Sequence, residues 1–316
     1  MRFLLTTCEG RRCELPEASA WTLTYTDGTP CDSFEVTCPW DGEGMELLPR
    51  LCRFTAEEDG EVRFTGVVDE AEYTRDSRGG SLLITGRGMA ALLLDNEAES
   101  ADYQTATLDE ILRRHVTPYG ITVAEKDSFP AVRGFSIESG QSEWRVLTDF
   151  VQYYGGVRPR FDRQGRLVLT GWKMAPVRVL GDDTPVTAWR LRESRYGRLS
   201  EVLVRDRVRG TKQTVTDADF QKTGGVCRRV LTMPGRSTGS AMRLSGEYQI
   251  AQSKRESRQL EVTLPVGFAA WPGECVRVEC TSPPLAGTWR VSEAVCRCGS
   301  HGIETVLTLN DTERDG

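Results

Sequence analysis

The sequence predicts a mainly β protein with a smaller α+β insert. Short runs that alternate apolar and polar residues fill positions 1–86 and return after residue 186, with turn residues between them. The stretch 105–175 instead carries two apolar stripes at helical spacing. A chain of 316 residues has room for two or three domains. We expect a first β-barrel over 1–95, an α+β module over 96–185 and a second β-barrel over 186–316, with a helical or irregular insert around 209–257.

The first β-region reads as strands joined by tight turns. Its candidate strands are SFEVTC, RLCRFTAEEDGEVRFTGVVDEAEYT and SLLITG. Hairpin-type breaks fall at EEDG (57–60) and SRGG (77–80), where polar residues and glycine favour turns. Several short strands at this spacing indicate a sandwich or a barrel.

The segment TGRGMAALLLDNEA (85–98) raises the question of a phosphate-binding loop. A dinucleotide-binding G-x-G-x-x-G would need a glycine where the chain has Ala91, within a βαβ unit. The surrounding pattern is antiparallel β, so neither condition is met. We expect Gly86 and Gly88 to let the strand turn sharply, and 89–94 to pack as a short helix or strand against the first barrel.

The middle of the chain begins with a predicted helix, TLDEILRRHV, which has one apolar face. Thr107 and Glu110 form a capping-box pattern at its start. Pro118 and Gly120 end it. His115 lies near the apolar stripe, and because no nucleophile motif accompanies it, we interpret it as a packed histidine.

A second helix is predicted at SEWRVLTDFVQYYGG, where aromatic and aliphatic residues share one face and Gly155 and Gly156 end the helix. Core packing explains these aromatic residues without a ligand. The following VRPRFDRQGRLVLTGW predicts a β-hairpin around residues 163–165.

The second β-region contains five candidate strands. They are LSEVLVRDRV, RQLEVTLP, ECVRVEC, TWRVSEAVCRC and IETVLTLN. A stretch rich in glycine and threonine, expected to be irregular, separates the first two, and SAMRLSGEYQIAQSKRES after it is moderately helical. The polar tail DTERDG is expected to fray.

An internal duplication is the strongest long-range signal. Residues 70–85 align without a gap onto 293–308, with five identities in sixteen positions. Both segments form the last hairpin of a β-region, which adds weight to the match. We therefore predict two superimposable β-barrels, over 1–95 and 186–310. One continuous sheet through both regions, or unrelated topologies, would contradict this prediction.

No residue pattern predicts catalysis. The chain lacks the Walker loop, the G-x-S-x-G elbow and the H-E-x-x-H motif. Asp69 and Glu70 are neighbours on a strand and point to opposite faces, so we interpret them as solvated or salt-bridged rather than as a glycosidase pair. We expect no enzyme activity, with no catalytic residue, no cofactor-binding residue and no metal ligand.

The cysteines are numerous but lack metal-ligand spacing. They stand at positions 8, 13, 31, 38, 52, 227, 275, 280, 296 and 298. None forms a C-x-x-C pair, and His115 and His301 do not complete a Cys/His cage. Cys296 and Cys298 are predicted to share one strand face. We predict that all ten are reduced thiols without metal, many of them buried.

Charge is distributed unevenly along the chain. Residues 1–100 hold 20 acidic and 9 basic side chains, a net charge of −11, whereas 187–258 hold 7 acidic and 16 basic, a net charge of +9. No dense Lys/Arg run or interleaved aromatic platform accompanies the basic stretch, so contacts between copies are favoured over nucleic-acid binding. The beginning lacks a secretory apolar segment, and no run is long enough to cross a bilayer, which predicts a cytoplasmically made protein without membrane insertion.

Several short motifs carry a resemblance to a known family. In order they are FTGVVDEAEY, TGRGMAALLLDNEA, ATLDEILRRHVTPYGITV, GQSEWRVLTDFVQYYGGVRPRFDRQGRLVLTG and the ending GTWRVSEAVCRCGSHGIETVLTLN. Over roughly residues 60–175 their order and spacing resemble the baseplate hub proteins of contractile-tailed bacteriophages, of the late-control-D type, which are related to the hub part of type VI secretion spikes. Residues 1–50 and 205–255 match only in general character. Arg87-Gly88 stands where the family more often has Arg-Asp.

This resemblance implies a structural hub without a cofactor. It implies a homotrimer in which each chain gives two similar β-barrels to a pseudo-sixfold ring, joining a sixfold tail tube to a threefold spike. The implied partners are further copies of the chain, the tail tube protein, the spike protein and a baseplate wedge or LysM-type tail protein. The implied location is the tail baseplate of a virion assembled in the host cytoplasm.

Other functions remain open at this point. The chain could be the hub of a non-contractile tail or a bacteriocin particle. It could also be a tail protein associated with a cell-wall hydrolase, or a β protein that binds nucleic acid.

Overall fold

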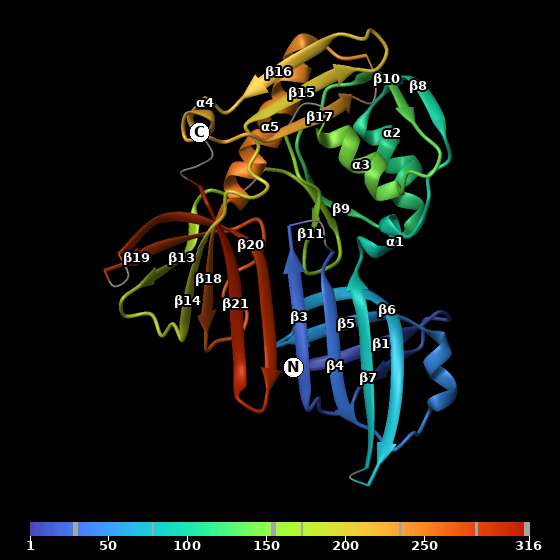
Figure 1. Ribbon diagram of the computed structural model, residues 1–316. Coiled ribbons are helices and arrows are strands. Elements are labelled where there is room, and N and C mark those ends of the chain that lie inside the picture. The colour runs from blue at the N-terminus through green and yellow to red at the C-terminus, as the bar shows by residue number, and fades with distance from the viewer. Residues whose placement is uncertain are drawn as a thin grey trace.

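The computed structural model describes residues 1–27, 31–77, 79–152, 156–171, 173–233, 236–281 and 284–312. The fold is mainly β. A 13-stranded sheet dominates it, and three smaller sheets accompany an α+β region and a long helix (Figure 1).

The first half of the large sheet comes from the N-terminal strands. They are β1 (Arg2–Thr7), β2 (Arg12–Glu14), β3 (Ala20–Thr26), β4 (Ser33–Pro39), β5 (Leu51–Glu58), β6 (Glu61–Asp76) and β7 (Gly79–Gly88), with the 3-10 helix η1 (Met45–Arg50) before β5. Their order in the sheet is β3-β4-β7-β6-β5-β1-β2, and every pair is antiparallel. Alternate side chains are buried along these strands, as the alternation in the sequence predicted.

The second half of the sheet comes mainly from the C-terminal strands. They are β13 (Pro176–Gly181), β14 (Ala188–Glu193), β18 (Arg258–Leu264), β19 (Cys275–Cys280), β20 (Leu285–Gly299) and β21 (Gly302–Asp311). Their order is β14-β18-β21-β20, with β19 beside β20 and β13 beside β19. β13 runs parallel to β19, and the other pairs are antiparallel.

The two halves are joined edge to edge by antiparallel pairing of β20 with β3. The paired stretch runs from Glu293 opposite Thr26 to Cys298 opposite Trp21. One hydrophobic core then serves both halves, since Trp21 stacks on Phe268 with ring centroids 6.0 Å apart. The prediction of two separate closed barrels is therefore wrong. The free edges of β3 and β20 satisfy each other's backbone groups instead of closing within each half.

The two halves nevertheless repeat the same strand arrangement. The order β3-β4-β7-β6-β5-β1 corresponds to β14-β18-β21-β20-β19-β13, and the strands also follow each other along the chain in that correspondence. Adding 223 to each number converts the β6–β7 register into that of β20–β21, from Gly66↔Gly88 to Asp76↔Gly79. The bulge between Val68 and Glu70 recurs at the equivalent place in β20. The predicted match of 70–85 with 293–308 is thus confirmed in hydrogen-bond register, with β1 and β13 differing in direction.

The middle of the chain forms an α+β region whose hydrophobic core also takes in residues between 199 and 242, such as Val202 and Met242. Its elements are α1 (Ala91–Leu94), β8 (Ala101–Ala106), α2 (Leu108–His115), η2 (Thr117–Tyr119), β9 (Val123–Lys126), β10 (Val132–Ile137), α3 (Glu143–Gln152), β11 (Arg160–Phe161) and β12 (Leu167–Leu169). Both predicted helices and the predicted hairpin β11–β12 are confirmed. The Thr107 side chain accepts a hydrogen bond from the Glu110 backbone N–H, as the capping pattern predicted. Gly155, expected to help end α3, lies outside the described residues.

The short helix after β7 packs differently from the prediction. Residues 91–94 form α1 and contact α3, and Leu93 belongs to the core of the α+β region rather than to that of the large sheet. The helix therefore ties β7 to the α+β region.

A third unit lies at the top of Figure 1 and contains β15 (Glu201–Asp206), β16 (Lys212–Thr216), α4 (Ala218–Lys222), β17 (Arg228–Met233) and α5 (Gly239–Glu256). The sheet order is β16-β15-β17, and α5 contacts β15 and β16. The stretch expected to be irregular thus holds two strands, whereas the helix predicted after it is confirmed. The predicted strand LSEVLVRDRV forms β15, which belongs to this smaller sheet and not to the large one. The segment inserted into the large sheet therefore begins before residue 209. The division of the chain at residues 95 and 185 stays a prediction.

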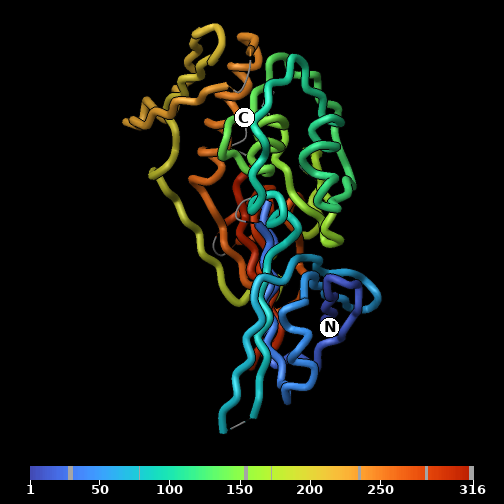
Figure 2. Tube along the Cα trace, turned by 90° about the vertical axis from the view of Figure 1, so that its right-hand side faces the viewer, coloured from blue at the N-terminus to red at the C-terminus, as the bar shows by residue number. Residues whose placement is uncertain are grey.

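Seen from the side, the molecule is elongated (Figure 2). The β6–β7 hairpin extends beyond the rest of the large sheet, at the end opposite to α5. The basic stretch 187–258 lies for the most part far from this hairpin, in the unit around α5. Only its two ends, β14 and Arg258 at the start of β18, belong to strands of the large sheet.

Candidate functional site at the sheet junction and edges

The junction between β3 and β20 is built from alternating buried residues. Leu23 and Cys296 lie opposite each other and are buried on the core side of the sheet. The Tyr25 hydroxyl donates to the backbone oxygen of Arg63 at 2.9 Å, and burial raises the pKa of that hydroxyl well above its usual value. The core side of the junction is therefore buried in the interior of the large sheet.

One end of the junction is fixed by a buried ion pair. Arg158 donates to both carboxylate oxygens of Asp27, at 2.9 and 2.8 Å, and the Asp27 backbone N–H donates to the Ser292 oxygen at 3.1 Å. Burial raises the pKa of Asp27, and the Arg158 charge opposes that shift. The pair connects the end of β3 to the chain just before β11.

The Gly86-Arg87-Gly88 segment forms the end of strand β7. β7 continues through Gly88, so the predicted sharp turn is wrong. A Cβ on Gly86 would lie 2.0 Å from the Val67 oxygen, so glycine is required there because the neighbouring backbone is close.

The Arg87 guanidinium forms ion pairs with two carboxylates. It makes bidentate pairs with Asp69, at 2.7 and 2.9 Å, and with Asp95, at 2.9 and 2.7 Å. Hydrogen bonding to Arg87 lowers the pKa of Asp95. The interpretation of Asp69 as salt-bridged is confirmed. These carboxylates occupy the positions that a phosphate would need, so the segment is unsuited to hold one.

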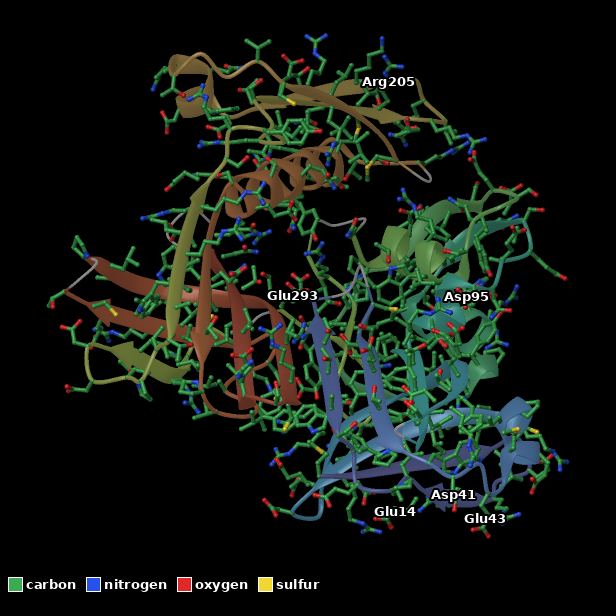
Figure 3. All side chains as sticks on the ribbon, turned by 60° about the horizontal axis from the view of Figure 1, so that its bottom comes forward. Glu14, Asp41, Glu43, Asp95, Arg205 and Glu293 are labelled. Carbon is green, nitrogen blue, oxygen red and sulfur yellow. The ribbon has the colours of Figure 1, made fainter. Side chains whose placement is uncertain are left out.

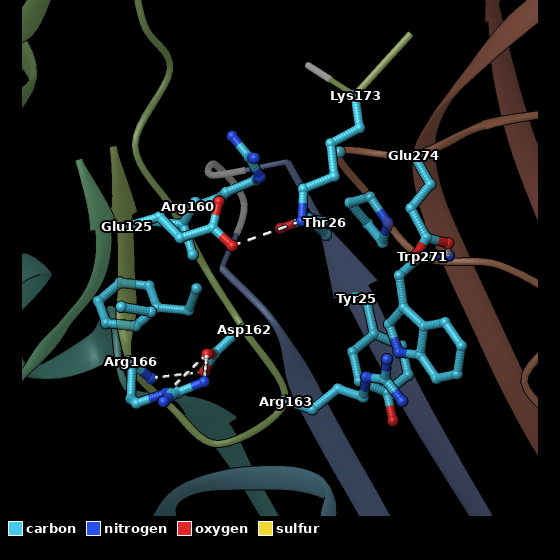
Figure 4. Close-up of a pocket in the computed structure, with 15 residues that line it drawn as sticks. Tyr25, Thr26, Glu125, Arg160, Asp162, Arg163, Arg166, Lys173, Trp271 and Glu274 are labelled. Atoms are coloured by element: carbon cyan, nitrogen blue, oxygen red, sulfur yellow. Dashed lines mark hydrogen bonds and ion pairs between the residues drawn. The ribbon is translucent and has the colours of Figure 1, made fainter. Parts of the chain in front are cut away.

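A cavity of about 200 Å³ separates the large sheet from the β11–β12 hairpin (Figure 4). Two of its acids are paired with cations, Asp162 with Arg166 at 2.7 Å and Glu125 with Lys173 at 3.4 Å, and a third, Glu274, accepts a hydrogen bond from the Trp271 backbone N–H at 2.9 Å. Arg163 reaches across from the hairpin and lies over the Trp271 ring, 3.7 Å from its centroid. These contacts attach the hairpin to the sheet and provide no nucleophile–base pair among the described lining residues.

His115 belongs to a buried polar cluster that links α2 to α3. Its Nε2 lies 3.0 Å from the Tyr103 hydroxyl and its Nδ1 lies 2.6 Å from Glu143 Oε2. Tyr119 donates to the other Glu143 oxygen at 3.0 Å. The interpretation of His115 as a packed histidine is confirmed, because each polar atom of its ring has a partner.

The cysteines are free thiols of mixed exposure. Four are buried and Cys8 is exposed. Cys296 is buried and Cys298 packs against the same core, which confirms that they share a face. Within the described ranges no three His, Cys, Asp or Glu side chains gather as a metal site would require. No helix in the described part of the chain is both long and apolar enough to cross a membrane.

Two exposed strand edges were missed by the sequence analysis. β14 has five of its six residues exposed, and the outer end of β6, beyond its bulge, is largely exposed as well. Figure 3 instead places Glu293, at the β3–β20 junction, near the middle of the molecule. A signal for β14 existed, because Trp189 in β14 occupies the position of Trp21 in β3. Trp21 pairs with Val36 and Trp189 pairs with Val262, at equivalent positions of β4 and β18.

Comparison with known proteins supports a tail function. Residues 90–171 match the family model "Baseplate hub protein gp44-like, second domain". The baseplate hub protein gp44 of Escherichia phage Mu is 28% identical over 101 residues, which span 30% of this chain and 27% of that protein. Residues 90–171 are therefore similar to the second domain of a baseplate hub protein, and the matched stretch spans about a quarter of the length of gp44.

Solved structures share its fold over nearly the whole chain. A tail protein from Neisseria meningitidis MC58 has a TM-score of 0.80 at 19% identity, covering 98% of this chain and 96% of that one. The 43 kDa tail protein of prophage MuSo2 from Shewanella oneidensis has a TM-score of 0.79 at 18% identity, covering 99% of each. The E. coli c3393 protein, a type VI secretion component, has a TM-score of 0.62 at 13% identity, covering 95% of this chain and 75% of that one.

Proposed function

We propose that the chain is a structural, non-enzymatic hub of a phage tail baseplate, which assembles as a homotrimer and joins the sixfold tail tube to the threefold spike. The observation that carries this proposal is the repeated six-strand order in one chain. Three copies provide six modules of related topology to a sixfold partner and three identical chains to a threefold partner. The match to a baseplate hub family supports the same role.

The proposal includes partners and a place. Tube and spike bind opposite faces of the ring, and a baseplate wedge or LysM-type tail protein binds its periphery. Assembly takes place in the host cytoplasm and the hub remains in the virion tail. The same geometry also suits the hub of a non-contractile tail or a bacteriocin particle.

Light scattering of the purified chain, alone and with tube and spike proteins, tests the trimer. We expect three times 35.2 kDa at low salt, and negative-stain images of a ring. A ring that dissociates in high salt while circular dichroism stays unchanged supports association tuned by charge. A chain that stays monomeric in the presence of both partners contradicts the proposal.

A nucleic-acid-binding function is less well supported. Several arginines of the basic stretch are already paired, including Arg198 with Asp217 at 2.9 Å and Arg228 with Glu201 at 2.6 Å. Paired guanidinium groups release fewer counterions on binding DNA. A DNA-binding protein should be retained on immobilised duplex DNA at low salt and released as NaCl rises to about 0.2 M, whereas a hub should not be retained at either concentration.

A further inference from the structure

We propose that the outer end of β6 in one copy pairs with β14 of the next copy, in the register that β20 and β3 use within one chain. This inference rests on the proposed ring but specifies a contact that the ring alone does not require. It follows from three observations, which concern equivalence, free edges and side-chain chemistry.

The first observation is the equivalence of the strands. β6 corresponds to β20 by the constant difference of 223, and β14 corresponds to β3 through the paired positions of Trp21 and Trp189. Within the chain, β20 already pairs with β3, so one of the two equivalent junctions is made internally. The other junction joins β6 to β14.

The second observation is that both edges are free within the described residues. There, β14 pairs only with β18, and β6 beyond its bulge pairs only with β7. A row of unpaired backbone N–H and C=O groups is a template for another strand. β14 and β6 lie at opposite sides of the molecule in Figure 1, so they cannot pair within one copy.

The third observation is the chemistry that this register brings together. Converting the β20–β3 pairs to the equivalent residues gives six antiparallel pairs: Glu70↔Ser194, Ala71↔Glu193, Glu72↔Arg192, Tyr73↔Leu191, Thr74↔Arg190 and Arg75↔Trp189. Glu72 faces Arg192 directly, with Glu70 and Arg190 on the same face. Opposite charges across an antiparallel pair are favourable.

The other face of the same pairing is apolar. Leu191 is 43% exposed in the single copy, on the side where its counterpart Leu23 is buried. Opposite it lies Tyr73, whose ring packs edge-on against Trp40 at 5.4 Å. The incoming β14 therefore buries Leu191 beside an aromatic pair, while its arginines meet the acidic face.

Disulfide trapping tests the register. Copies carrying Glu72→Cys are mixed with copies carrying Arg192→Cys, together with tube and spike proteins, and oxidised mildly. We expect a reversible covalent dimer whose peptide map contains the bond between positions 72 and 192. The control mixture of Glu72→Cys with Glu193→Cys places the second thiol on the opposite strand face, and we expect at least tenfold less of the equivalent bond.

Charge reversal provides an independent measurement. Glu72→Arg alone and Arg192→Glu alone each place like charges opposite one another at all three junctions, so we expect roughly tenfold higher protein concentration for half-assembly. The double variant restores the opposite charges and assembles as the original chain does. Circular dichroism checks that each variant is folded.

The outcomes separate this inference from the proposed function. A trimer that forms without the 72–192 bond, and that tolerates both single reversals, overturns the register while the hub remains. A chain that stays monomeric with both partners overturns the hub itself. The trapped bond together with rescue in the double variant supports both.

Discussion

Arg158 and Asp27, 131 positions apart in sequence, form a two-pronged ion pair at the end of the strand junction. Asp27 is nearly buried, with 11% of its side chain exposed. Arg158→Ala leaves this carboxylate without its cation, so we expect a loss of about 3 kcal/mol in the free energy of unfolding. Urea denaturation measures it.

A surface pair serves as the control for Arg158. Lys126 and Asp109 lie 2.5 Å apart with 46% and 81% of their side chains exposed. Lys126→Ala should cost less than about 1 kcal/mol. Equal losses in the two variants would contradict the structural role assigned to Arg158.

Arg87 should act in stability and not in ligand binding. Arg87→Lys keeps the charge but cannot satisfy Asp69 and Asp95 together, so we expect a loss of about 1–2 kcal/mol by urea denaturation. Millimolar phosphate or ATP should leave the melting temperature of the original chain unchanged. A ligand-induced rise that disappears in the variant would restore the phosphate-site interpretation.

Asp32 should make stability depend on pH. Burial raises its pKa to about 7, while hydrogen bonds from the Thr26 N–H and hydroxyl oppose the shift. Between about pH 4 and pH 7 the folded state holds a proton that the unfolded state has released. The contribution of Asp32 to the free energy of unfolding therefore falls as the pH rises through that range. Asp32→Asn removes this pH dependence. The free energy of unfolding of the variant, relative to that of the original chain, should therefore be higher at pH 8 than at pH 5.

Denaturation at both pH values measures this difference. The exposed Asp109→Asn is the matched control and should show no such change between pH 5 and pH 8. An Asp32→Asn variant whose relative stability is the same at both pH values would contradict the raised pKa.

The hairpin glycines give a contrasting pair of substitutions. Gly86→Ala forces a Cβ against the Val67 oxygen and the Phe34 ring, at 2.0 and 2.6 Å, so we expect a loss of at least about 2 kcal/mol. Gly299→Ala, at the tip of the equivalent hairpin, has no atom within 4 Å and should change stability by less than about 0.5 kcal/mol. Thermal melting compares the two.

Local features of the fold were predictable from the sequence. The apolar stripe and Thr107 cap specify α2 within a few residues, and the hairpin spanning 70–85 is specified by alternation and turn residues. These signals are local because helices and hairpins satisfy most of their hydrogen bonds between near neighbours.

The long-range arrangement was not predictable in the same way. The sequence does not specify which strand pairs with the free edge of β3, because every strand edge offers the same backbone N–H and C=O groups. The pairing with β20 depends on how the two halves of the sheet pack in three dimensions. Arg87 shows the same limit at the level of a site. Its partner Asp69 was interpreted as solvated or salt-bridged, but the simultaneous contact with Asp95 depends on how α1 follows β7.

The shared core has a consequence for synthesis on the ribosome. Thr26 is paired with Glu293, which emerges about 270 residues later. At elongation rates of roughly 5–20 residues per second, β3 waits about 15–50 s for the strand that covers its edge. During that interval the nascent N-terminal half presents an unpaired edge and Trp21 without its stacking partner. Productive folding of this chain therefore depends on protecting an early segment until translation is almost complete, and holding chaperones should bind it there.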